Sequence, residues 1–205
     1  MGPEPVARRG RPRSEAADGR ITDAAQELLL DRGYDRFSVD EVAVQAGVAK
    51  TTLYRRWPTK DHLVVAVVAR MQDEVPVEYR GDVRADLTRY LNAIVDGLHG
   101  MRLAGRPSAS GDTSAGVVAE VAAAAARHAD IGAAVRAMFL RRNALVLRML
   151  EQARDAGELQ KGVDPEVVFD QLAGALYYRL LITGAPIDAA YVDRLVASVL
   201  RGASG

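Results

Sequence analysis

Apolar residues recur every three to four positions along most of the chain, and this helical spacing restricts its fold more than any other feature. Alternating β-branched runs joined by hairpin turns, the signal of strands, are almost absent. Serine, threonine, glycine and proline residues separate the periodic segments and set their ends. The pattern predicts an all-α fold of about nine helices, near residues 14–32, 39–46, 49–56, 60–78, 83–101, 115–127, 131–156, 164–182 and 188–201.

The residues that the chain lacks exclude several classes of protein. It contains no cysteine, so disulfides, thiolate catalysis and cysteine-bound metals are excluded. Its three histidines, His62, His99 and His128, are far apart in the sequence, so we expect neither a metal site nor a cofactor. No apolar run approaches the roughly 18 residues of a membrane span, and no apolar signal-peptide segment follows the basic N-terminus. We therefore expect a cytoplasmic protein without membrane partners.

Residues 38–56 contain the signals of two short helices joined by a tight turn. Ser38 and Glu41 form a capping box, in which the serine bonds the backbone of the first turn and the glutamate bonds back to the cap. Gly47 ends the first helix and Pro58 ends the second. Such a pair is typical of a helix-turn-helix. The small apolar residues suited to holding it together are Val39, Val42, Ala43 and Leu53.

Polar and basic side chains gather on the second helix of this pair, at Lys50, Thr51, Thr52, Tyr54 and Arg55. Lysine and arginine can bind guanine edges or phosphate, and threonine can bond either while its methyl group packs on thymine. The net charge is zero, yet residues 8–13 and residues 42–60 each contain four basic residues and no acid. Local patches on a neutral protein indicate nucleic-acid binding. A cationic tail beside a solvated helix face is the alternative interpretation.

The stretch SVDEVAVQAGVAKTTLYRRWPTKDHL at 38–63 closely resembles the signature of the tetracycline-repressor (TetR) family, within a match over 19–63. The resemblance implies a three-helix DNA-binding domain for a near-palindromic operator. By position, it implies phosphate contacts from Ser38, Tyr54 and Lys60, and groove contacts from Lys50, Thr51, Thr52 and Arg55. Two residues depart from the signature. Ala49 replaces the usual serine or threonine cap of the recognition helix, and Trp57 replaces a phenylalanine and is interpreted as core.

We expect three parts along the chain. Residues 1–13 form a disordered basic arm, residues 14–60 the helix-turn-helix domain, and residues 61–205 a helical ligand-binding and dimerisation domain. The boundary falls inside the fourth helix, so the two domains share it. In the arm, the run containing Arg9 and Arg11 is similar to the core of an AT-hook, whose arginines enter narrow A·T minor grooves. A nonspecific tail is the alternative.

The C-terminal stretch at 174–188 also resembles the family, in which the last two helices pack against their symmetry mates as a four-helix bundle. The resemblance implies a homodimer, and a two-fold axis suits a near-palindromic site. The residues expected at this seam are Leu176, Leu180, Val192, Leu195, Val196 and Val199. An ordinary core within one chain would give the same apolar stripes.

The family resemblance also implies a small-molecule pocket among the C-terminal helices. Its expected lining comes from two helical stripes, Tyr90, Ile94, Leu98 and Met101 on one helix and Met138, Leu145 and Met149 on another. Methionine suits an adaptable apolar cavity, although the same stripes could be core. Arg142 interrupts the second stripe, so it either extends to solvent, pairs with an acid, or awaits an anionic or carbonyl group.

These patterns together predict a dimeric transcriptional regulator that a small-molecule effector releases from double-stranded operator DNA. We expect a repressor, because a dimer seated over a promoter blocks polymerase without another contact. An enzyme is the main alternative class, but the sequence has no paired carboxylates in a recognisable context, nucleophile elbow, phosphate-binding glycine loop or metal cluster. A helical protein-interaction adaptor would leave the acid-free recognition helix unexplained.

Overall fold

The computed structural model describes residues 12–103 and 116–203, and every regular element in these ranges is helical, which confirms the all-α prediction. The described ranges contain nine α-helices and one π-helical turn, in the order α1 (Pro12–Arg36), α2 (Val39–Gln45), α3 (Lys50–Tyr54), α4 (Lys60–Asp73), α5 (Val83–Leu103), α6 (Gly116–Arg127), α7 (Ala129–Asp155), α8 (Pro165–Tyr178), η1 (Arg179–Thr183) and α9 (Ala189–Ala203). Within these ranges, no helix has both the length and the apolar character that crossing a membrane requires.

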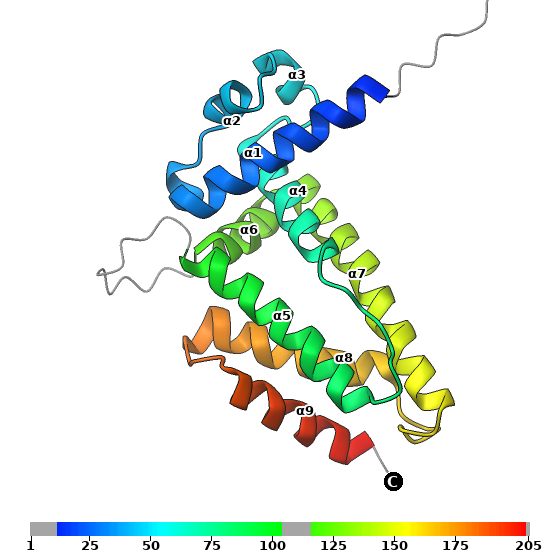
Figure 1. Cartoon of the computed structure of the whole chain (residues 1–205). Coiled ribbons are helices and arrows are strands. Elements are labelled where there is room, and N and C mark those ends of the chain that lie inside the picture. Colours follow the sequence, from blue (N-terminus) through cyan, green and yellow to red (C-terminus); the bar gives the residue numbers. More distant parts are fainter. Residues whose placement is uncertain (1–11, 104–115, 204–205) are drawn as a thin grey trace, which may run out of the picture.

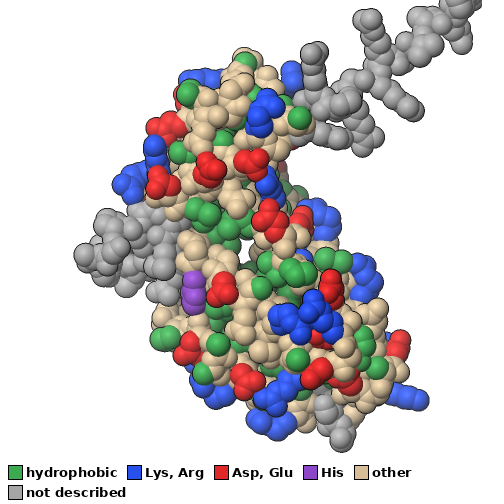
Figure 2. Space-filling model, in the orientation of Figure 1, with side chains coloured by type: hydrophobic (Ala, Val, Ile, Leu, Met, Phe, Trp, Pro, Cys, Tyr) green, Lys and Arg blue, Asp and Glu red, His purple; other side chains and the backbone are tan. Residues whose placement is uncertain are grey.

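The helices form two parts that meet through α4 and through the contacts of α1 with α5 and α6. The helices α1, α2 and α3 lie at one end of the molecule, and α9 lies at the other (Figure 1). α1 packs against α2 and α4 and also contacts α5 and α6, and α5 packs against α6 and α9. α4 contacts both parts, because it packs against α1 and also against α6 and α7. Figure 2 shows a waist between the two parts, with apolar side chains beside it. A movement of α4 would therefore change contacts in both parts.

The first helix begins earlier than expected and breaks where expected. α1 begins at Pro12, two residues before the expected start at residue 14. Proline is favoured in a first turn, where its missing N–H would be unpaired in any case. Gly33 interrupts α1 with a φ of +72°, a conformation that glycine adopts without steric cost. The break lets the chain turn from α1 toward α2.

The fourth helix is shorter than its periodicity suggested. It was expected to reach Glu78, but α4 ends at Asp73 and a non-helical segment follows. Pro76 explains the difference, because proline lacks an N–H and disfavours helical geometry at Val75. The connection from α4 to α5 is therefore extended rather than helical.

The segment between α4 and α5 is bonded to the helices around it. The Glu158 carboxylate accepts hydrogen bonds from the Tyr79 hydroxyl and, at 2.7 Å, from the Val83 amide. The buried carboxylate of Asp86 accepts a hydrogen bond from the Arg80 amide, also at 2.7 Å. These bonds hold the segment against the C-terminal part, so α4 is tethered at its end.

The eighth helix begins as its sequence predicts. The Asp164 carboxylate caps it by accepting a hydrogen bond from the Glu166 amide at 2.9 Å, and Pro165 occupies the first turn. The helix continues into the π-helical turn η1, which Gly184 ends with a φ of +63°. The stretch that resembles the family at 174–188 thus includes the end of α8, η1 and the connection to α9.

Candidate DNA-binding surface and internal cavity

The helix-turn-helix is assembled by local hydrogen bonds. The Ser38 hydroxyl accepts a hydrogen bond from the Glu41 amide at 3.4 Å and so caps α2. The Glu41 carboxylate, expected to bond back to the cap, forms an ion pair with Arg32 of α1. The turn after α2 contains Gly47 at a φ of +65°, and the Val48 amide donates to the carbonyl of residue 43 at 3.0 Å. The predicted glycine turn between two short helices is therefore confirmed.

The recognition helix α3 is short and lacks a side-chain cap. Ala49 occupies the cap position without a side-chain hydrogen bond, as its departure from the family signature suggested. Leu53 is the residue that anchors α3, because its side chain is fully buried. Trp57, which follows, is partly buried and packs against the core, as interpreted from the sequence.

The structure brings the predicted DNA contacts to one exposed segment. Lys50, Thr51, Tyr54 and Arg55 are exposed, and Thr52 is half-buried. Within the described part of the chain, Arg55 has no ion-pair partner, so its guanidinium is available for a phosphate or a guanine. The exposed side chains along α3 therefore match the chemistry of groove reading.

Two of the basic residues that made this segment look strongly cationic are paired with acids from other helices. The Lys50 ammonium lies 2.6 Å from the Asp40 carboxylate of α2. Arg56 pairs with Asp18 of α1. Counting charges within residues 42–60 missed both partners, because they lie outside that segment in the sequence. The surface around α3 is consequently less basic than the charges of residues 42–60 alone suggest.

Lys60 begins α4 beside the helix-turn-helix and is only partly available. Its ammonium donates to the backbone carbonyl of Asp35 at 3.3 Å and lies 4.3 Å from the centre of the Tyr34 ring. The Tyr34 hydroxyl in turn hydrogen-bonds the Asp61 carboxylate. Burial lowers the pKa of Lys60. These contacts fix the start of α4 against the end of α1.

A cavity of about 380 Å³ lies among α4, α5, α6, α7 and α8. Such a volume is in the range that drug-sized ligands occupy, roughly 300–1,000 Å³. Its wall is mainly apolar and aromatic, with a few polar side chains. The lining residues are Val68, Gln72, Tyr90, Leu91, Ile94, Leu98, Met101, Val118, Val121, Ala122, Val135, Met138, Phe139, Arg142, Asn143, Phe169, Asp170, Ala173, Leu176, Tyr177 and Leu181.

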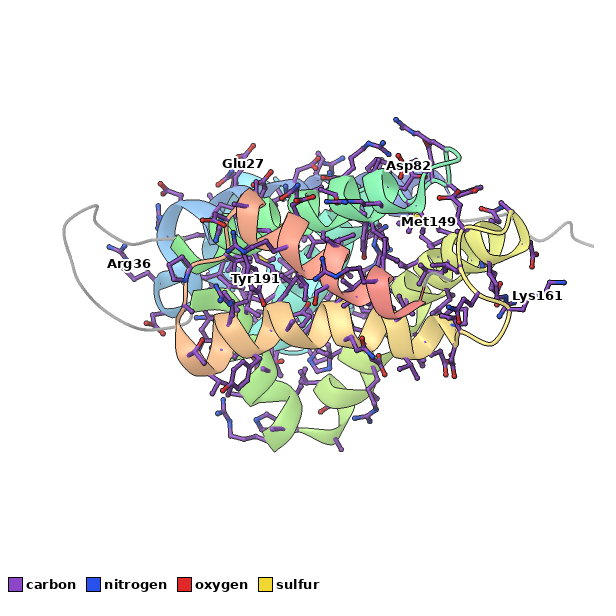
Figure 3. All side chains as sticks on the ribbon, turned by 90° about the horizontal axis from the view of Figure 1, so that it is seen from below. Glu27, Arg36, Asp82, Met149, Lys161 and Tyr191 are labelled. Carbon is purple, nitrogen blue, oxygen red and sulfur yellow. The ribbon has the colours of Figure 1, made fainter. Side chains whose placement is uncertain are left out.

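Most of the expected pocket residues line this cavity, and two do not. Those in the wall are Tyr90, Ile94, Leu98, Met101, Met138 and Arg142. Leu145 is exposed, because the buried stripe of α7 passes through Val146 instead. Met149 is buried, but it lies about 10 Å along the helix from Arg142, toward the C-terminal end of α7 (Figure 3). Neither residue is therefore part of the wall of this cavity.

The polar groups of the cavity wall are concentrated near α4. Arg142, only 3% exposed, donates from Nη2 to the backbone carbonyl of Val75 at 2.5 Å, and its guanidinium carbon lies 5.0 Å from the centre of the Tyr90 ring. Gln72 of α4 and Tyr177 of α8 both line this cavity. Burial raises the pKa of Tyr177 to about 12 and also raises that of Tyr90. This part of the wall is thus polar, and burial favours the neutral form of both tyrosines.

Sequence reasoning missed much of this wall. Phe139 and Tyr177 meet edge to face, with ring centres 6.0 Å apart, and Phe169 lies 6.4 Å from Tyr90. Tyr177 is not among the pocket residues expected from the sequence. Gln72 could have been found as a polar residue on the buried stripe of α4, but Asn143 and Asp170 gave no such signal.

Comparison with known proteins assigns the chain to a family. Residues 21–67 match the profile described as bacterial regulatory proteins, tetR family, and residues 77–199 match the profile described as Tetracyclin repressor-like, C-terminal domain. The chain belongs to the TetR family. It is therefore a DNA-binding transcriptional regulator, and its relatives are regulators rather than enzymes, as the sequence predicted.

Similar TetR-family proteins cover nearly the whole chain. The uncharacterized HTH-type transcriptional regulator YdeS of Bacillus subtilis (strain 168) is 31% identical over 96% of this chain and 94% of its own. The DNA-binding transcriptional repressor TetR of Mycobacteroides abscessus is 32% identical over 92% of this chain and 94% of its own. The crystal structure of the TetR family transcription regulator SCO0332 is 32% identical, covers 92% of this chain and 99% of its own, and has a TM-score of 0.73.

In this TetR-family regulator, the residues expected at a dimer seam fall into two groups. Leu176, Leu180, Val192 and Val196 are already buried within the single chain, and Leu176 lines the cavity. Leu195 and Val199 are only partly buried. Figure 3 shows α8 and α9 side by side, with Tyr191 on α9. The large apolar side chains that α8 and η1 expose are Val167, Tyr178 and Ile182.

The expected arm contacts, Arg9 and Arg11, lie outside the described residues.

Proposed function

We propose that this TetR-family regulator is a homodimeric repressor that leaves a near-palindromic operator when an apolar small molecule fills its cavity. One observation supports release most directly. α4 contributes Val68 and Gln72 to the cavity wall, and its first residue, Lys60, lies against the end of α1. A ligand that presses on α4 therefore acts on the helix that supports the DNA-binding part.

The energetic requirement for such release is modest. A ligand shifts a conformational equilibrium only by its preference for one state over the other. To lower DNA affinity a hundredfold, it must favour the non-binding state by about 2.7 kcal/mol. The two reading heads of a dimer must lie roughly 34–36 Å apart to bind both half-sites. A shift of α4 that breaks some of its contacts with α1 would move the heads away from this spacing, and the shifted conformation would not bind the operator.

Different observations support repression and the assignment of DNA contacts to α3. The similar protein of Mycobacteroides abscessus is named a repressor. Exposure of Lys50, Thr51 and Arg55 supports their assignment to the groove, together with half-buried Thr52. Tyr54, Ser38 and Lys60 are assigned to phosphates.

Lys50 and Lys60 provide the test of this DNA-binding assignment. We expect Lys50→Ala to cost about 1–3 kcal/mol on the operator and to relax specificity at one base position. We expect Lys60→Ala to weaken all sequences alike and to flatten the salt dependence by about one unit. The operator is first obtained by sequencing DNA fragments that the purified protein selects, and affinities are then measured in a salt series. A Lys50→Ala variant with wild-type affinity and specificity would show that the reading head is misassigned.

The proposed dimer uses the outward face of α8, η1 and α9, where Val167, Tyr178 and Ile182 are joined by the partly buried Leu195 and Val199. We expect Ile182→Glu to give monomers in sedimentation and to lose binding to a two-half-site operator, because the change would bury a charge in an apolar seam. Leu140→Glu on α7 is the matched control, since Leu140 and Ile182 are both 72% exposed. Unchanged sedimentation of Ile182→Glu places the interface elsewhere.

A further inference from the structure

Arg142 is a buried cation at the end of the cavity nearest to α4. It is only 3% exposed, and it is surrounded by a wall that is otherwise mainly apolar. A buried charge without a partner destabilises a fold by several kcal/mol unless something compensates it. The partners of Arg142 therefore indicate what the cavity is built to receive.

The structure satisfies only part of this guanidinium. Nη2 donates to the carbonyl of Val75, and the planar group faces the ring of Tyr90. Among the described residues, the buried Nε–H has no hydrogen-bond partner, and no carboxylate forms an ion pair with Arg142. Asp170 is the acidic residue in the cavity wall, but its side chain is exposed to solvent. Among the described residues, the charge of Arg142 thus has no carboxylate partner and its Nε–H has no acceptor, although the side chain lines the cavity.

A planar carboxylate fits this deficit better than a neutral carbonyl. The Arg fork presents parallel N–H groups that match two carboxylate oxygens, and only an anion also neutralises the charge. The remaining wall requires an apolar body, with Met101 and Met138 able to adapt to its shape and Phe139 and Phe169 offering ring faces.

We propose that Arg142 binds the carboxylate of an apolar monocarboxylic acid, and that compounds of this class are the effectors. The inference rests on the proposed function for its regulatory consequence, but not for the binding itself. Arg142 also holds Val75, just beyond the end of α4. A carboxylate that draws the guanidinium toward the cavity competes with the hydrogen bond to Val75. Binding of the acid at Arg142 would therefore loosen the chain at the end of α4.

Matched acids and amides test the proposal. The probes are decanoate and 2-naphthoate, each compared with its own primary amide, which keeps the shape of the head group but removes the charge. Binding to the full chain is measured by calorimetry and by the rise in melting temperature, without DNA. We expect each acid to bind at least about tenfold more tightly than its amide, as a charge-assisted bond to a buried cation implies.

Variants locate the effect at Arg142. Arg142→Met should remove the preference for the acid, and Arg142→Lys should retain part of it, because lysine keeps the charge but not the fork. Arg141→Met is the matched control, since Arg141 is the exposed neighbour on the same helix and should leave the preference intact. Circular dichroism and melting of the ligand-free variants establish that each is folded. If Arg142→Met does not fold, the test depends on Arg142→Lys alone. An Arg142→Lys variant that prefers the acid over the amide as strongly as the wild type overturns the proposal.

Three other results overturn it as well. These are acids that bind no more tightly than their amides, the failure of both acids to bind, and acid binding that survives Arg142→Met unchanged. Operator affinity of the ligand-free protein is measured separately. If the ligand-free wild-type protein does not bind an operator but still prefers acids to amides, only the proposed function is refuted. If it binds the operator but does not prefer acids, only the role of Arg142 is refuted.

Discussion

The DNA-binding part and the ligand-binding part share α4 but are stabilised in different ways. In the first, short helices are fixed by a serine cap, a glycine turn and ion pairs at the surface, and α3 is held through Leu53. In the second, long helices enclose a cavity whose buried Arg142 is only partly hydrogen-bonded. On the proposed function, the first part presents its surface to DNA, and the second keeps a cavity with an incompletely bonded cation for a ligand.

The largest expected effect comes from removing the anchor of α3. Leu53 is fully buried, and replacing a buried leucine by alanine costs about 2–5 kcal/mol. We expect Leu53→Ala to lower the free energy of unfolding by this amount and to abolish operator binding, because a five-residue helix has little else to hold it. Denaturant unfolding and gel shift measure the two effects.

Leu172→Ala separates the two parts. Leu172 is also fully buried, but it belongs to α8 in the other part. We expect a similar loss of stability with operator binding retained under conditions in which the variant is folded. Equal losses of DNA binding in the two variants would contradict the contrast and would indicate that the whole chain sets the geometry of the head.

The contrast also explains what could be predicted from the sequence. Ser38, Gly47 and Pro58 act on their immediate neighbours, so the helix-turn-helix was recognised with its boundaries correct to within two residues. Pro76 is an equally local signal, and neglecting it made α4 too long. The ion pairs of Lys50 and Arg56 were missed, because their acids come from other helices.

The cavity depends on packing that periodicity does not report. A helical stripe shows which side of a helix is buried, but not where five helices leave a space between them. Hence Arg142, a cation on an apolar stripe, was identified from the sequence, whereas Met149 on the same stripe lies beyond the cavity. Tyr177 shows the same limit, since an apolar wall and a core look alike in a sequence.

A smaller effect should appear at high pH in the cavity wall. Burial raises the pKa of Tyr177 to about 12, compared with about 10 in an unfolded chain. Above pH 10 the unfolded chain loses this proton while the folded chain keeps it, so stability that is complete below about pH 10 is lost as the pH rises toward 12. Between these values we expect wild-type stability to fall by roughly 1–3 kcal/mol more than that of Tyr177→Phe, in urea titrations. Superimposable pH profiles would show that this end of the cavity is wet.

The smallest expected effect concerns the uncapped recognition helix. Ala49 leaves the first amides of α3 without a side-chain acceptor. We expect Ala49→Ser to raise the free energy of unfolding by about 0.5–2 kcal/mol, as N-caps generally do, while operator binding is retained. Ala137→Ser, at an exposed position inside α7, is the control and should give no gain. No gain from Ala49→Ser would mean that the rest of the head already fixes α3.

The ion pair between Lys50 and Asp40 bears on how the protein searches a genome. Attraction to arbitrary DNA depends on how many phosphates the protein neutralises. A lysine held 2.6 Å from a carboxylate contributes little to that sum, although an exposed pair of this kind is weak enough to open. We therefore expect residence on unrelated sequences to be shorter than it would be with a free lysine at this position. If Lys50 contacts the operator as proposed, an acceptor on the DNA replaces Asp40 there, and the protein discriminates better because its binding to the rest of the chromosome is weaker.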